Sequence, residues 1–209
     1  MLRFHRKTGV NIDLEEEGTV AIRTCSFSNA IVFSNRPLMV NETFLFEIQD
    51  CDPKWAGYLR CGVTLHNPKK TILPQFLVPD LMNLGQSWVF AIKPSIEHPF
   101  GNTYVNPNLP RSLVAGVEKC REVTVTQLHS DLLAKSQFAG CEPTGEGSRV
   151  GLHLTEEGSL YYIINGVQYG PCVSGIPLKQ SEVYAVVDLY GITKKIRLVH
   201  GVGRLSYKY

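Results

Sequence analysis

The sequence lacks a strong excess of charge of either sign. Its 209 residues include 21 lysines and arginines and 19 acidic residues, which leaves a formal net charge of +2. The densest basic groups are only the pairs Lys69-Lys70 and Lys194-Lys195. Proteins that bind nucleic acid through electrostatics concentrate many cations on one face. The charge pattern therefore predicts no nucleic-acid partner.

Long apolar runs are missing as well. No stretch approaches the roughly 18 uncharged apolar residues that a transmembrane helix requires, so no membrane span is expected. The opening segment MLRFHRKTG becomes polar at once, so no signal peptide is expected either. These absences favour a cytoplasmic protein.

The sequence also lacks the cysteine and histidine spacing of a metal site. No two of the six cysteines form a C-x-x-C pair, and the six histidines include no H-E-x-x-H motif and no i,i+4 pair. Asp50 and Asp52 flank Cys51, and although such carboxylates can hold a cation, a solvated turn is favoured. We therefore expect free thiols, no metal and no cofactor. The cysteines stand at positions 25, 51, 61, 120, 141 and 172.

Motifs of catalysis are equally scarce. No G-x-S-x-G elbow occurs, Gly201-x-Gly203 lacks the third glycine of a dinucleotide loop, and Gly145-x-Gly147 lacks the lysine of a phosphate loop. A hydrolase whose cysteine or serine is activated by a distant histidine stays open, because such groups assemble across a fold. The sequence nevertheless predicts a protein that is not an enzyme.

Strand patterns dominate what is present. Short runs of alternating or β-branched apolar residues are separated by turn signals such as Glu17-Gly18 and Glu157-Gly158, and Asn165-Gly166 suits a two-residue hairpin turn. Such spacing predicts an all-β fold, an antiparallel β-sandwich. The predicted strands are 19–23, 31–34, 43–49, 58–65, 87–92, 149–154, 160–165, 183–189 and 195–200.

The helical signals are weak, and one stretch is irregular. Only 78–84 and 123–135 could be helical, and the residues from about 93 to 147 suggest a long irregular insertion within one sandwich. We expect a single domain over 3–203 and a C-terminal tail over 204–209. The expected core includes Phe44, Phe46, Leu59, Cys61, Val63 and Val186.

The strand over 58–65 poses a particular question. Its apolar face carries Leu59, Cys61 and Val63, but the opposite face carries Tyr58, Arg60, Gly62 and Thr64 instead of an ordinary solvent-facing polar row. Either another part of the chain covers this second face, or the face binds a partner.

The N-terminal third carries a dense set of motif residues over 4–68. They are Phe4-His5, Gly9, Asn11-Ile12, Leu14, Ser26-Phe27, Val32-Phe33-Ser34, Pro37-Leu38, Trp55, Gly57, Leu59-Arg60, Gly62, Thr64 and Pro68. This pattern resembles the Neuralized homology repeat. The resemblance implies a concanavalin/SPRY-like jelly roll that binds a target protein or peptide without catalysis.

Segments further along the chain resemble members of this family that carry one repeat followed by a SOCS box. The resemblance implies a substrate-recognition adaptor of a Cullin–Elongin ubiquitin ligase. Nothing after Val199 has the length or periodicity of a helical SOCS box, and no RING-type zinc pattern occurs. Ligase components are therefore expected as partners only through a SOCS box outside this sequence. The alternative function is an intracellular glycan-binding, lectin-like sandwich.

Sandwich modules often bind partners through loops at one end of the sheets. We expect such a surface to use tyrosine, tryptophan and arginine, the residue types that most often dominate binding energy. An alternative is that Trp55 only anchors the core and Arg36 is a solvated loop residue. The predicted protein-binding residues are Asn35, Arg36, Trp55, Tyr58, Arg60 and Tyr190.

Overall fold

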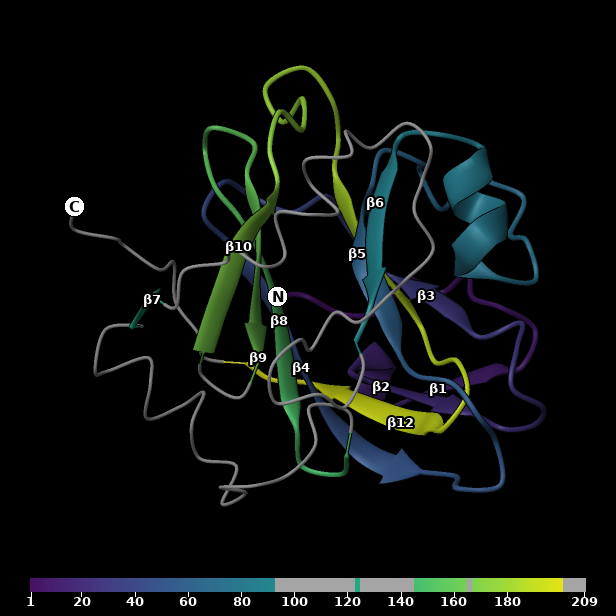
Figure 1. Cartoon of the computed structure of the whole chain (residues 1–209). Coiled ribbons are helices and arrows are strands. Elements are labelled where there is room, and N and C mark those ends of the chain that lie inside the picture. The colour runs from purple at the N-terminus through teal and green to yellow at the C-terminus, as the bar shows by residue number, and fades with distance from the viewer. Residues whose placement is uncertain (93–122, 125–144, 165–166, 201–209) are drawn as a thin grey trace.

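Two β-sheets pack face to face (Figure 1). The computed structural model describes residues 1–92, 123–124, 145–164 and 167–200. The larger sheet has the strand order β1-β2-β12-β4-β8-β9-β10-β7, and the smaller sheet has the order β3-β11-β5-β6. Every strand pair in both sheets is antiparallel. The predicted antiparallel sandwich is therefore confirmed.

The elements have the following bounds. The strands are β1 (Ile12–Glu15), β2 (Val20–Arg23), β3 (Ile31–Phe33), β4 (Thr43–Cys51), β5 (Arg60–Thr64), β6 (Ser87–Ala91), β7 (Val123–Thr124), β8 (Arg149–Leu154), β9 (Leu160–Ile164), β10 (Val167–Val173), β11 (Tyr184–Asp188) and β12 (Thr193–Leu198). The short helical segments are η1 (Glu16–Gly18) and η2 (Leu77–Leu81).

The predicted strands are all present, and the differences lie at weaker signals. β1 was not predicted, because it is only four residues long and two of these are acidic. β9 and β10 pair with Val167 opposite Ile164, as the predicted hairpin requires, but the Asn165-Gly166 turn lies outside the described residues. In the region predicted to be helical, 123–124 forms β7, and the rest of that region lies outside the described residues.

The main core lies between the two sheets. Along β4, Phe44, Phe46 and Ile48 are fully buried against the smaller sheet, as the two-residue period of a strand requires. The predicted core residues Leu59, Cys61 and Val63 face them from β5 and from the residue before it. Alternation along single strands therefore identified the layer that holds the sandwich together.

A second apolar cluster covers the outer face of the smaller sheet. Val186 was predicted in the main core, but it belongs to this second cluster, because neighbouring residues of β11 point to opposite faces. Leu77 and Leu81 of η2 pack over it, and Figure 1 shows this helical segment beside β3 and β6. Gly62 and Thr64 therefore lie on a face that another part of the chain covers.

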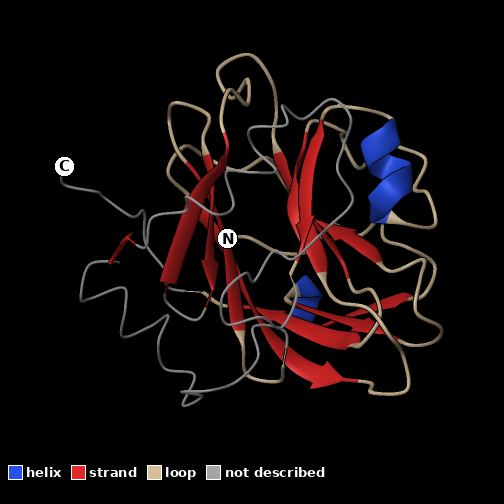
Figure 2. Ribbon diagram, in the orientation of Figure 1, coloured by secondary structure: helices blue, strands red, loops and turns tan. Residues whose placement is uncertain are grey.

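Helical structure is confined to two short places in the described chain (Figure 2). The segment predicted over 78–84 is present as η2 with a short continuation, and it is helical because Leu77 and Leu81 anchor it on the sheet. Among the described residues, no helix has the length and apolar character needed to cross a membrane.

Candidate protein-binding surface

The predicted binding residues lie at the two ends of β11. Arg60 begins β5 opposite Asp188, the last residue of β11, and Tyr190 follows two residues later. At the other end, Ser34 donates its backbone N–H to Ala185, so Asn35 and Arg36 lie beside the start of β11. The prediction that all six residues share one end is therefore wrong, because β3 runs antiparallel to β11 and carries the chain away from Tyr190.

Four aromatic rings gather at the Tyr190 end, and we call them the aromatic cluster: Phe27, Trp55, Phe76 and Tyr190. The Phe27 ring is central, with ring centroids 5.3 Å from Trp55, 5.8 Å from Tyr190 and 6.3 Å from Phe76. Phe76 and Tyr190 also contact each other edge to face at 6.1 Å. All four side chains are half-buried, so part of each residue is accessible to solvent while the rings hold one another in place.

Backbone contacts lock the segments that carry the cluster. Ile192 donates its N–H to the Gly57 carbonyl at 3.0 Å, and Gly191 donates to the Phe27 carbonyl at 3.4 Å. Gly57 has a φ of +99°, and a Cβ at this position would lie 2.4 Å from Cε1 of Tyr190. Glycine is required there because the Tyr190 ring packs directly on the backbone. The rings are therefore held by a rigid junction of three segments.

Arg60 connects the cluster to the η2 segment. Its guanidinium carbon lies 3.7 Å from the centroid of the Tyr190 ring, and Nη1 donates to the Val78 carbonyl at 2.7 Å. This stacking holds the ring by a cation–π interaction. Tyr58 is half-buried and lies between Trp55 and Arg60 in the chain. Ring contacts thus bring together three of the six predicted residues, Trp55, Arg60 and Tyr190.

A buried carboxylate lies beneath this surface. Asp188 is fully buried, its Oδ2 accepts the Leu77 N–H at 3.0 Å, and its Oδ1 has no hydrogen-bond partner among the described residues. Burial raises the pKa of Asp188 to about 6, although the Leu77 N–H and the charges of Arg60 and Arg23 act in the opposite direction. Arg23 is also buried and donates to the Gly191 and Thr193 carbonyls.

At the opposite end, Arg36 and Asn35 are engaged within the chain. Arg36 forms two hydrogen bonds to the Glu42 carboxylate, at 2.7 and 2.8 Å, and a third to the Pro37 carbonyl. Burial alone would raise the pKa of Glu42, but the hydrogen bonds from Arg36 and from the Met39 N–H lower it below its usual value. Asn35 Oδ1 accepts the Arg3 N–H at 3.0 Å. These side chains stabilise their own loop.

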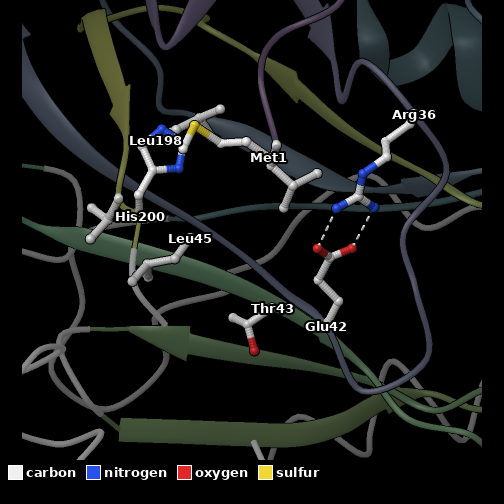
Figure 3. Close-up of a pocket in the computed structure, with 9 residues that line it drawn as sticks. Met1, Arg36, Glu42, Thr43, Leu45, Leu198 and His200 are labelled. Carbon is white, nitrogen blue, oxygen red and sulfur yellow. Dashed lines mark hydrogen bonds and ion pairs between the residues drawn. The ribbon is translucent and has the colours of Figure 1, made fainter. Parts of the chain in front are cut away.

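A cavity of about 240 Å³ opens beside this ion pair (Figure 3). Apolar side chains, Thr43, His200 and the Arg36–Glu42 pair form its walls, and Figure 3 shows the two charged groups facing each other across the pair of hydrogen bonds. Since each charge already has a partner, the cavity presents no free charged group from this pair to a ligand. The lining residues are Met1, Leu2, Arg36, Glu42, Thr43, Leu45, Leu198, Val199 and His200.

Burial shifts the pKa values of the Cys51 and Cys61 thiols and of the His153 imidazole. Burial raises the pKa of the Cys61 thiol and raises that of Cys51 to about 11, so neither thiol ionises readily near neutral pH. Burial also lowers the pKa of His153 to about 4. Within the described ranges, no three His, Cys, Asp or Glu side chains are grouped so that they could hold a metal ion.

Three residues at or beneath this surface, Phe27, Phe76 and Asp188, have only weak signals in the sequence. Phe27 belongs to the Ser26-Phe27 pair of the family pattern, and that position was its only signal. Phe76 lies in a segment whose apolar residues have neither the spacing of a strand nor that of a helix. Asp188 ends an otherwise apolar strand, and a lone acid in such a run was the signal for a buried charge.

Comparisons with known proteins give a consistent result. The Neuralized family model matches residues 4–200. Neuralized-like protein 2 of Homo sapiens is 34% identical over 219 residues, which cover 94% of this chain and 76% of that protein. E3 ubiquitin-protein ligase NEURL3 of Homo sapiens is 26% identical over 202 residues, which cover 95% of this chain and 59% of that protein.

A solved structure shows the same fold. The crystal structure of the Drosophila melanogaster neuralized NHR1 domain matches with a TM-score of 0.67 at 24% sequence identity. The match covers 96% of this chain and 98% of that domain, so the two chains share the arrangement of their sheets.

Proposed function

Because the chain belongs to the Neuralized family, we propose that it is a non-catalytic module that binds a target protein or peptide through the aromatic cluster. The observation that carries this proposal is the half-buried group of four rings, locked by backbone bonds at one end of a rigid sandwich. Rigid aromatic side chains bury a large area at a low entropic cost, which is why they dominate many interfaces.

Charge around the cluster favours a polar contact at its rim. Lys54 lies 5.6 Å from the centroid of the Trp55 ring, and its side chain is 68% exposed. Its ammonium is 3.0 Å from Asp52 Oδ2, and because the lysine side of this ion pair is open to solvent, the pair contributes little to stability. The lysine therefore remains available to a carboxylate or carbonyl of a partner that covers Trp55.

The wider role in our proposal is that of a substrate-recognition adaptor, for a ubiquitin ligase of the Cullin–Elongin type. The support is the family itself, in which one relative bears the name E3 ubiquitin-protein ligase. Recruitment of Elongin and Cullin would require a SOCS box outside the present sequence. We place this role in the cytoplasm, a proposal that agrees with the free thiols of Cys25 and Cys61.

The binding proposal predicts different results for variants at the two ends. Trp55→Ala and Tyr190→Ala should each weaken target binding about fivefold to thirtyfold, the loss of about 1–2 kcal/mol typical of an interface anchor. Arg36→Ala and Asn35→Ala serve as controls at the opposite end and should retain binding. Targets are identified by affinity capture with quantitative mass spectrometry, and their dissociation constants are then measured by calorimetry.

The outcomes separate the competing functions. Melting curves of each variant show whether lost binding reflects unfolding, and Elongin and Cullin subunits are scored apart from targets. Loss of binding in Arg36→Ala with normal binding in both cluster variants would contradict the proposal, because the target would then bind at the Arg36 end of the sandwich. Capture that disappears after enzymatic removal of glycans from the lysate would instead support the glycan-binding alternative.

A further inference from the structure

Residues 76–82 form one side of the aromatic cluster, and we call this segment its wall. Two polar contacts attach the wall to the smaller sheet. The Leu77 N–H donates to Asp188 Oδ2 at 3.0 Å, and the Val78 carbonyl accepts from Arg60 at 2.7 Å. Phe76, which precedes them, supplies one ring of the cluster. The position of this ring therefore depends on how firmly the segment stays on the sheet.

Apolar contacts and a buried charge act in opposite directions on this attachment. Leu77, Leu81 and Met82 are almost fully buried in the second cluster, which favours docking of the segment. Asp188 is buried by the same docking, and its Oδ1 has no hydrogen-bond partner among the described residues. An ionised carboxylate with one oxygen unsatisfied is costly to bury.

We propose that residues 76–82 form a movable wall of the aromatic cluster, and that the charge on Asp188 sets how firmly this wall docks on the smaller sheet. A neutral Asp188 holds the wall closed. An ionised Asp188 loosens it, so that a partner can displace Phe76 and reach the rings behind. The link to partner binding rests on the proposed function, whereas the motion of the wall does not.

The direction of the pH effect follows from the charges that face Asp188. Arg60 on β5 and Arg23 on β2 favour its ionised form, whereas Asp80 of η2 and burial favour the neutral form, and burial is the largest effect. The docked segment thus holds the pKa near 6, above the value of 3.8 for a solvated aspartate. A raised pKa in the docked state means that docking is strongest at low pH and weakens as the pH rises through this window.

Hydrogen exchange measured by mass spectrometry tests the proposal without any partner. The protection factor of the segment 76–84, corrected for the intrinsic rate, should fall about tenfold between pH 5 and pH 8. Asp188→Asn removes the charge and should abolish this dependence. Asp80→Asn is the matched control: Asp80 accepts the Phe76 N–H at 3.2 Å in the same segment, and its charge is the smallest of the influences on Asp188, so the variant should keep most of the dependence.

Three results would overturn the proposal. The first is a wild-type protection factor that does not change with pH, a measurement that needs no variant to fold. The second is an equal pH dependence in Asp188→Asn. The third is exchange of 76–84 that responds to low urea as steeply as exchange of β4, since the segment would then open only when the whole domain unfolds.

Discussion

Replacing Phe44 with alanine is expected to lower the free energy of unfolding by about 3–5 kcal/mol. Phe44 is fully buried at the centre of the main core, where its ring meets Phe4 edge to face at 6.1 Å and Phe46 at 6.2 Å. Removal of the ring leaves a cavity between two sheets, and the strand pairing of β4 with β8 and β12 limits how far the backbone can collapse into it.

Equilibrium denaturation in urea measures this change. Ile72→Ala is the control, because Ile72 is 89% exposed and its truncation should alter stability by less than about 0.5 kcal/mol. A loss below about 1 kcal/mol for Phe44→Ala would mean that the two sheets are not packed as closely as the structure shows.

Replacing Gly62 with alanine is expected to cost about 3 kcal/mol or more, because the added methyl group has no space. A Cβ on Gly62 would lie 1.9 Å from the Trp88 carbonyl oxygen and 2.8 Å from the Val89 Cα, both in the backbone of the neighbouring strand β6. Backbone atoms held in the β5–β6 strand pairing cannot rotate away as the end of a side chain can. β5 and β6 would therefore have to separate.

Gly175→Ala provides a matched comparison for this prediction. Gly175 has a φ of +83° but no heavy atom within 4 Å of the added Cβ, so its substitution incurs only the conformational cost, about 1 kcal/mol. Thermal melting of both variants separates steric overlap from backbone conformation. Equal destabilisation of the two proteins would contradict the close approach of β6 to Gly62.

The pattern of apolar residues by itself determined the strands and most of the main core. In β4 and β5 every second residue is apolar, and a strand places every second side chain on one face, so Phe44, Phe46, Cys61 and Val63 could be assigned to the core without a structure. The motif pattern in the N-terminal third predicted the Neuralized family, to which the chain belongs.

In the smaller sheet, the pattern of apolar residues did not predict which layer each side chain contacts. Strand β11 is buried on both faces, so its apolar run gives no sign of which side chain meets which layer, and Val186 lies under η2 and not between the sheets. The second face of β5 had two interpretations, covered by the chain or open to a partner, because its residues do not show what lies over them. Only the position of η2 decided that Gly62 and Thr64 are covered while Arg60 reaches the edge of the surface.

The tertiary structure alone decided which predicted binding residues meet. Antiparallel pairing of β3 with β11 separates Arg36 from Tyr190 by the length of a strand, and neither residue carries a local signal of that distance. Phe27 and Phe76 join Trp55 through contacts between segments far apart in the sequence. Sequence patterns report the neighbours of a residue along the chain, whereas a binding surface is made from neighbours in space, and the pairing of strands determines those.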